Sequence, residues 1–161
     1  NKYTNGQAST VGKVIKYLTK NQAIIVHSCD LYFKINFVEI KKKLKKYDII
    51  VLTAQGKEYN FKNSTQFSWV RKNNNNRVEI SLKNNFSKNK KKNRVVVGSF
   101  IFKNKEILKK SIDYITKHKL KIKNEYYLDH AASISKKIGY ELGEIVVKKY
   151  KSWGSLNEIK I

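Results

Sequence analysis

The sequence predicts an α/β fold, with one sheet of mostly parallel strands, flanking helices and one inserted antiparallel hairpin. Short apolar runs rich in β-branched residues alternate along the chain with helical patterns. Two strand patterns are joined by four asparagines at 73–76, a residue type that tolerates left-handed turns. The 161 residues contain no repeat or linker, which favours a single domain spanning residues 1–161.

The first two expected elements are a helix and a strand. Residues 11–18 place apolar side chains at helical spacing, and Ser9 or Thr10 is the expected N-cap. Residues 23–30 (AIIVHSCD) form an apolar run that ends in small polar residues and a carboxylate. We expect a buried strand of a parallel sheet, whose carboxyl end opens into a ligand-binding crevice.

A second helix and a second strand are expected to complete a crossover. The helix begins near Asn36, and its lysines are expected to form a solvated face. Residues 48–54 (DIIVLTA) form another short buried strand. Strand, helix and strand with short connections favour a right-handed parallel crossover. Residues 55–65 are expected to be a loop.

The middle of the chain contains the hairpin and the most hydrophobic strand. Residues 66–71 and 77–83 have strand patterns, and a basic loop follows at 84–93. The next strand is 94–102 (RVVVGSFIF), in which Gly98 indicates a bulge or a close approach by ligand or backbone. A plain packing role for this glycine is the alternative.

Two helices and a strand are expected toward the C-terminus. Asn104 can cap the first helix, and Asp129 can cap a second one that ends at Gly139. Residues 144–147 form the last expected strand. A turn follows, in which Trp153 is expected to plug the core.

The strong positive charge indicates a compositional bias more than a binding face. The formal net charge is +23, yet only three of the 35 basic residues are arginine. Arginine is the residue favoured for bidentate recognition of phosphates and bases. The lysines accompany abundant asparagine and isoleucine, and proline is absent. A nucleic-acid partner is therefore not expected.

Composition also bears on the compartment. No apolar run approaches the roughly 20 residues needed to span a bilayer, and no secretory signal is visible. The single cysteine, Cys29, fits a reducing cytosol, so a cytoplasmic location is expected. The sequence has no methionine and begins at Asn1, so we expect it to be part of a longer protein.

Five stretches carry a family resemblance through their order and spacing. They are residues 6–10 (GQAST), 28–30 (SCD), the hairpin 67–83, 97–102 (VGSFIF), and 124–128 (NEYYL) together with 153–155 (WGS). In this order they resemble motifs of the sugar-phosphate nucleotidyltransferases, and most of all those serving capsule or surface-polysaccharide synthesis. These enzymes make nucleotide sugars from a nucleoside triphosphate and a sugar 1-phosphate.

The resemblance covers nearly the whole chain and implies a fold, a reaction and partners. The implied fold is the three-layer, Rossmann-like sheet of nucleotide-diphospho-sugar transferases, without the family's N-terminal glycine-rich loop. This chain would be the C-terminal two-thirds of the catalytic domain. The implied partners are the two substrates and the missing N-terminal segment, and a second copy of the chain is a further candidate. In the implied reaction a sugar-phosphate oxygen attacks the α-phosphorus and displaces pyrophosphate.

The same resemblance implies roles for particular residues. Asp30 would hold Mg²⁺ as metal ligand and catalytic residue, and Lys83 would balance the sugar phosphate. Glu125 would accept hydrogen bonds from sugar hydroxyls. The full set of implied substrate-binding residues is Gly6, Gln7, Ala8, Ser68, Gly98, Glu125 and Tyr126. A plain cap of the next segment for Asp30 and a solvated surface position for Lys83 are the alternatives.

Three departures from the family pattern keep other functions open. The glycine-rich loop is absent, the glutamate expected before Lys83 is Leu82, and the aspartate expected before the closing turn is Ser152. This chain alone is therefore not expected to be a competent catalyst. The first alternative is a non-catalytic relative used for binding or assembly. The second is a basic nucleic-acid module, which would need exposed aromatics among Phe67, Trp69, Phe100 and Phe102.

Overall fold

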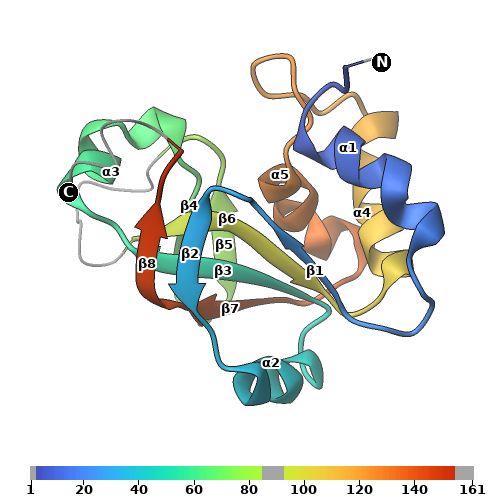
Figure 1. The fold of residues 1–161 in the computed structure, drawn as a ribbon, viewed down its shortest axis with the longest axis horizontal. Helices are drawn as coiled ribbons and strands as arrows, with labels where there is room; N and C mark the ends of the chain where they lie inside the picture. The colour runs from blue at the N-terminus through green and yellow to red at the C-terminus, as the bar shows by residue number, and fades with distance from the viewer. Residues whose placement is uncertain (1–2, 85–92, 155–161) are drawn as a thin grey trace.

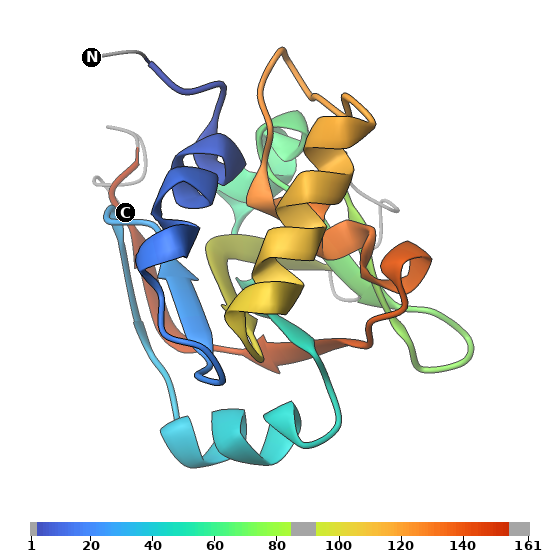
Figure 2. The same ribbon diagram turned by 90° about the vertical axis from the view of Figure 1, so that its right-hand side faces the viewer.

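The computed structural model describes residues 3–84 and 93–154, so most of the expected basic loop lies outside the described residues. A twisted six-stranded sheet crosses the molecule with helices on both faces (Figures 1 and 2). The strand order is β5-β4-β6-β3-β7, and β1 also pairs with β6. The strands are β1 (Ile24–His27), β3 (Ile49–Gln55), β4 (Trp69–Lys72), β5 (Val78–Ser81), β6 (Arg94–Phe102) and β7 (Leu142–Val146).

The strand directions agree with the predicted α/β class. β3 and β7 pair in parallel, whereas β6 is antiparallel to β1, β3 and β4. Four strands, β1, β3, β4 and β7, therefore run the same way, and β6 and β5 run the other way. Because β6 lies in the centre, most hydrogen-bonded neighbours are antiparallel even though most strands share one direction.

The prediction for residues 23–30 is wrong in two respects. β1 alternates between half-buried and exposed residues, so it is not a fully buried strand. It pairs antiparallel with β6 instead of parallel with β3. β1 and β3 do run in the same direction, as a crossover requires, but β6 lies between them. An apolar run of three residues cannot distinguish these cases, because its neighbours are fixed by segments far along the chain.

Two strands share one edge of β6, and they leave a gap between them. β1 pairs with residues 99–102, and β4 pairs with residues 94–95. The Val96 amide donates to the Ser68 carbonyl at 2.9 Å, which leaves Val97 and Gly98 between the two strands. Gly98 has φ +70, and over this stretch the register against β3 shifts between Val51 and Thr53. The bulge expected at Gly98 is confirmed.

Two hydrophobic clusters give the molecule three layers. One cluster joins α1 (Gln7–Val14), α4 (Lys105–Lys117) and α5 (Leu128–Ser133) to one face of the sheet. The other joins α2 (Phe37–Leu44) to the opposite face, mainly through Ile40. Figure 1 shows these helix groups on different sides of the strands. In the described part of the chain, no helix is long and apolar enough to cross a membrane.

Three of the predicted helix ends follow ordinary capping chemistry. Asn36 and Asn104 accept hydrogen bonds from the Val38 amide at 2.9 Å and the Ile107 amide at 3.0 Å, as predicted. Gly139, at φ +82, follows η3 (Ser135–Ile138), also as predicted. The prediction for α1 is wrong, because this helix begins at Gln7 and its N-cap is Gly6. A short 3-10 turn, η1 (Ile15–Tyr17), continues it.

Three further elements differ from the expectations. Residues 55–65 include α3 (Glu58–Lys62) and begin η2 (Ser64–Gln66), so they are not a plain loop. β2 (Leu31–Lys34) and β8 (Lys148–Ser152) form a separate two-stranded ribbon. Trp153, just beyond it, is 50% exposed and therefore does not plug the core. The lysine-rich sequence of β8 lacks a strand signal because water faces most of its residues.

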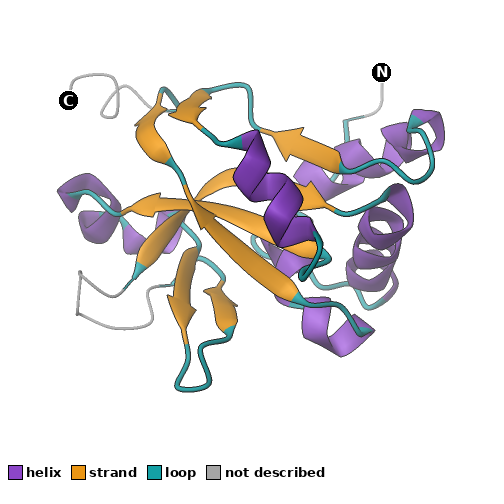
Figure 3. Cartoon of the chain, turned by 90° about the horizontal axis from the view of Figure 1, so that it is seen from below, coloured by secondary structure: helices purple, strands orange, loops and turns teal. Residues whose placement is uncertain are grey.

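The β4–β5 hairpin forms where it was predicted and extends away from the rest of the sheet (Figure 3). Its turn closes through the Asn73 amide, which donates to the Arg77 carbonyl at 2.9 Å, and Asn76 adopts φ +56. Trp69, Phe100 and Phe102 are fully buried. These three aromatics are therefore unable to stack on the bases of a nucleic acid.

Candidate functional site

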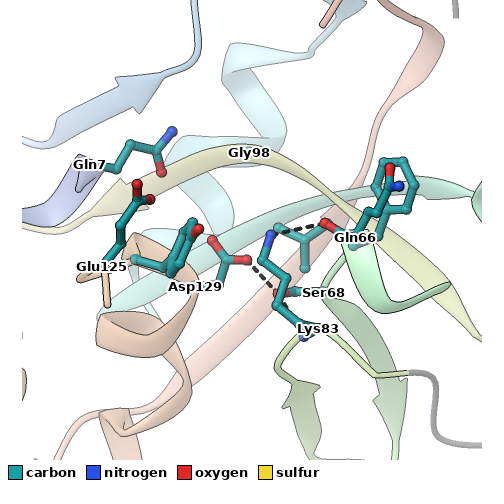
Figure 4. A pocket seen from close by; sticks show the side chains of 10 residues that line it. Gln7, Gln66, Ser68, Lys83, Gly98, Glu125 and Asp129 are labelled. Atoms are coloured by element: carbon teal, nitrogen blue, oxygen red, sulfur yellow. Dashed lines mark hydrogen bonds between the residues drawn. The ribbon is translucent and has the colours of Figure 1, made fainter. Parts of the chain in front are cut away.

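A cavity of about 300 Å³ opens at the gap between β1 and β4 on the edge of β6 (Figure 4). Segments far apart in the sequence supply its wall. The lining residues are Gln7, Gln66, Phe67, Ser68, Lys83, Val96, Gly98, Glu125, Tyr127 and Asp129. Five of the predicted site residues are among them: Gln7, Ser68, Lys83, Gly98 and Glu125.

The start of α1 is joined to the segment before α5 through backbone contacts. The Ala8 amide donates to the Tyr126 carbonyl at 3.0 Å, and the Tyr126 amide donates to the Asn5 carbonyl at 2.8 Å. Gly6 adopts φ +97, and a Cβ there would lie 2.8 Å from the Tyr126 backbone nitrogen. Gly6 and Ala8 do not line the cavity themselves. They place Gln7 and Glu125 at its wall.

Tyr126, predicted to bind substrate, contributes mainly as a support. Its side chain belongs to the hydrophobic core, and its backbone makes the contacts to α1. Tyr127 lines the cavity in its place. Burial, together with a hydrogen bond to Glu125 and the charge of that carboxylate, raises the pKa of Tyr127.

Gly98 forms another part of the wall, and Ser28, which does not line the cavity itself, contacts it. The Ser28 hydroxyl donates to the Gly98 carbonyl at 3.0 Å and lies 3.2 Å from the Gln7 side-chain nitrogen, which donates to it. A Cβ on Gly98 would lie 2.9 Å from the Ser28 oxygen. These contacts join the 28–30 turn to the cavity. Ser28 was not predicted as a site residue.

Lys83 is held with its ammonium group at the cavity. Its Nζ donates to the Gln66 carbonyl at 3.0 Å and lies 4.8 Å from the ring centroid of Tyr127. Its backbone adopts φ +54, two residues after the end of β5. This placement gives the cavity one cation with remaining donor capacity, because an ammonium group carries three donors.

Asp129 is a cavity residue that sequence reasoning misassigned. It is not a helix cap: Tyr127 is the N-cap of α5, and Asp129 is the second residue of the helix. Its side chain accepts a hydrogen bond from the Ser68 hydroxyl, and the two residues are 7% and 2% exposed. The Lys83 amide donates to the same hydroxyl oxygen at 3.4 Å. The relevant signal was the spacing of Asp129 from Glu125 and Tyr127, which places all three near the start of one helix.

Asp30, the predicted metal ligand, does not line the cavity. Its carbonyl accepts a hydrogen bond from the Trp153 amide at 2.9 Å, and the adjacent Leu31 pairs with Ser152 in the β2–β8 ribbon. Among residues 3–84 and 93–154, no group of three His, Cys, Asp or Glu side chains could hold a metal ion. Asp30 lies at a chain turn, beside the position of Ser152.

Comparisons with solved structures agree with this architecture. The model superposes on a nucleoside-diphosphate-sugar pyrophosphorylase from Vibrio cholerae with a TM-score of 0.74 and 16% identity, covering 99% of this chain and 65% of that one. A proposed glucose-1-phosphate thymidylyltransferase from Bacillus anthracis gives 0.69 and 18%, covering 99% and 60%. The inositol-1-phosphate CTP transferase from T. maritima gives 0.66 and 15%, covering 98% and 60%.

The chain thus spans about two-thirds or less of the length of these structures. No family model and no curated protein matches the sequence. Similarity at this level of identity establishes the arrangement of the backbone and leaves the chemistry to the site itself. The chain has the fold of the nucleotide-sugar pyrophosphorylases and sugar-1-phosphate nucleotidyltransferases.

Proposed function

We propose that this chain is the sugar-phosphate-binding part of a sugar-1-phosphate nucleotidyltransferase. One observation carries the proposal. Five residues implied by the family resemblance, drawn from segments between positions 7 and 125, line a single cavity. A chance resemblance would not bring its motif residues together in space.

Each polar group in the cavity suits part of such a substrate. Lys83 would neutralise the phosphate as a point charge. Glu125 would accept hydrogen bonds from sugar hydroxyls, and Gly98 would let the substrate approach the backbone of β6. Gln7, held by the Gly6 and Ala8 contacts, would face the nucleotide base. Catalysis of phosphoryl transfer relies mainly on positioning and charge neutralisation, and these groups can supply both.

Asp30 would hold the Mg²⁺ of such an enzyme. The Asp30 carboxylate would hold the ion close to the substrate phosphates, where the ion would supply charge neutralisation. The fit is partial, because Asp30 is one carboxylate and Mg²⁺ usually takes one or two carboxylates plus substrate phosphates. The triphosphate would therefore have to complete the coordination shell.

A pyrophosphate-release assay tests the proposal on the full natural reading frame. The purified protein is incubated with Mg²⁺, a panel of nucleoside triphosphates and a panel of sugar 1-phosphates. Release with one pair of substrates is expected, and Asp30→Asn should nearly abolish it without changing the circular dichroism spectrum. Full turnover by Asp30→Asn would disprove the metal assignment. If the folded protein releases no pyrophosphate with any pair of substrates, the transferase function is disproved.

The position of Ser152 allows a complementary gain-of-function test. The backbone contacts of the β2–β8 ribbon bring Ser152 close to Asp30 along the paired chains. A second carboxylate there should improve metal binding, so Ser152→Asp is expected to bind Mn²⁺ more tightly in a titration. The gain should vanish in the double variant with Asp30→Asn. An unchanged affinity would show that Ser152 is not at the second-ligand position.

The second candidate is a non-catalytic binding module with the same cavity. Leu82 and Ser152 favour it, because they replace two carboxylates that the family pattern expects. This candidate predicts sugar-phosphate or nucleotide binding by a folded protein that releases no pyrophosphate with any pair. Measuring binding and release on the same preparation separates the two functions.

A further inference from the structure

Asp129 is a buried carboxylate that accepts a hydrogen bond on only one of its two oxygens. Ser68 donates to Oδ2, and no other hydrogen-bond donor to this side chain is found in the described part of the chain. A buried charge is costly unless its lone pairs are satisfied. Within residues 3–84 and 93–154, the only fully buried side-chain nitrogen or oxygen without a hydrogen-bond partner is His130 Nδ1. Asp129 Oδ1 also has no partner there, so it cannot be fully buried. Oδ1 is therefore accessible at the cavity that Asp129 lines.

The position of Asp129 within the cavity suggests what it meets. Figure 4 shows Gln7 and Glu125 toward one end of the cavity, Lys83 and Ser68 toward the other, and Asp129 between them. An anionic group is attracted to the Lys83 end and repelled by the carboxylates of Asp129 and Glu125. The part of the ligand that lies over Asp129 must instead carry hydrogen-bond donors.

We propose that Asp129 is a ligand-binding residue that accepts a hydrogen bond from a hydroxyl of a phosphorylated, polyhydroxylated ligand and sets the preference for that ligand. The proposal rests on the proposed function and makes its substrate class more specific. The ligand places its phosphate at Lys83 and at least two free hydroxyls along Asp129 and Glu125. A ligand analogue with a hydrogen atom or a methoxy group in place of the hydroxyl that contacts Asp129 has no donor for this buried acceptor. Such an analogue should bind much more weakly than the ligand itself.

A purely structural role would not require a carboxylate. The Ser68 contact joins α5 to the start of β4, and the Lys83 amide adds to it. A neutral acceptor of the same size would keep both contacts. The charge of Asp129 is thus not needed by these contacts, whereas a ligand hydroxyl gains a stronger hydrogen bond from an ionised acceptor.

Asparagine at position 129 provides the discriminating variant. In Asp129→Asn the amide oxygen can still accept from Ser68, and the amide nitrogen replaces the free acceptor with a donor. The fold should survive, with an unchanged melting temperature. Asp113→Asn is the matched control, because Asp113 lies on the exposed side of α4 and its removal changes the net charge equally.

Isothermal titration measures binding of glucose, galactose, mannose and N-acetylglucosamine 1-phosphates, with inorganic phosphate as reference. The wild-type protein is expected to bind one sugar phosphate more tightly than inorganic phosphate. Asp129→Asn should weaken binding of that sugar phosphate by about tenfold or more, whereas binding of inorganic phosphate should not weaken, because the variant removes a charge that repels it. One monodeoxy analogue should bind weakly to the wild type, and its affinity should not fall further in Asp129→Asn. The hydroxyl that this analogue lacks is then the one that contacts Asp129.

The contrary outcomes separate the inference from the proposed function. Equal affinity of Asp129→Asn, Asp113→Asn and wild type for the sugar phosphate would overturn the role of Asp129 and leave the proposed function standing. No preference of the wild type for any sugar phosphate over inorganic phosphate would overturn both. If Asp129→Asn does not fold, the deoxy analogues are titrated against the wild type and Ser68→Ala. A ligand-binding role of Asp129 requires that one analogue binds more weakly than the others. Equal affinities for all analogues refute this role.

Discussion

Two carboxylates of this protein are almost equally buried but differ in how their oxygens are used. Glu144 on β7 is 6% exposed and Asp129 on α5 is 7% exposed. Glu144 accepts from the Thr53 hydroxyl at 2.6 Å and from both Nε and Nη2 of Arg94, the latter also at 2.6 Å. Asp129 accepts from Ser68, and its other oxygen faces a cavity.

Glu144 uses its charge within the sheet, whereas Asp129 has an oxygen left for a ligand. The Glu144 contacts join β3, β6 and β7, the three strands that form one side of the sheet, so the charge is used entirely by the fold. The pKa of Arg94 is raised, chiefly by the hydrogen bond with Glu144, against the opposing effect of burial. Burial alone therefore does not identify a functional acid. Unused hydrogen-bonding capacity at a cavity is the more informative feature.

Removing Glu144 should give the largest loss of stability. The Arg94 side chain is only 23% exposed, and Glu144→Ala leaves its guanidinium without its bidentate partner, so we expect a loss of about 3 kcal/mol in unfolding free energy. Urea denaturation monitored by circular dichroism measures this. Glu79→Ala is the matched control, because its pair with Arg71 is 46% and 38% exposed and should contribute about 1 kcal/mol or less. Equal losses in the two variants would refute the distinction.

Gly6→Ala should give the next largest effect, because it acts on the cavity through the backbone. An alanine at φ +97 is strained, and its Cβ would meet Tyr126 at 2.8 Å, so we expect a loss of about 1–3 kcal/mol. Separation of α1 from residue 126 should also weaken sugar-phosphate binding. Gly139→Ala is the control: it has a positive φ of +82 but no atom near a new Cβ. The control should be destabilised less and should bind normally.

The smallest effect concerns His130, the neighbour of Asp129 on α5. Burial lowers the pKa of His130, and its Nδ1 has no hydrogen-bond partner within the described residues. The unfolded chain therefore takes up a proton near the ordinary histidine pKa of about 6.5, before the folded protein does, and stability is lost as the pH falls through this range. His130→Gln should show a shallower loss between pH 7 and pH 5 in denaturant titrations. If the stabilities of the wild type and of His130→Gln fall in parallel with pH, His130 is not the cause of the loss.

The sequence predicted the parts of the fold in which local patterns suffice. β3 and β6 are long apolar runs, and α2 and α4 begin at asparagine caps, so their positions followed from neighbouring residues. β8 was missed because its residues, Lys148–Ser152, are mostly exposed and basic. Its strand conformation depends on pairing with β2, which lies more than a hundred positions earlier.

The candidate site also combines residues that sequence patterns predicted with a residue that depends on a distant contact. Gln7, Lys83 and Glu125 were predicted from motif resemblance, and all three line one cavity of the structure. Asp129 was missed because an aspartate at the start of a helix is also the ordinary sign of an N-cap. Its partner Ser68 lies 61 positions away, a separation that no local pattern can bridge.

The gap between β1 and β4 has a consequence for how this protein can evolve. Main-chain pairing to β6 fixes the width of the gap, whereas side chains from α1, the end of the hairpin and the start of α5 supply its chemistry. Substitutions in those three segments can change ligand preference one contact at a time without disturbing the sheet. The chemistry of the cavity can therefore change while the sheet that frames it stays the same.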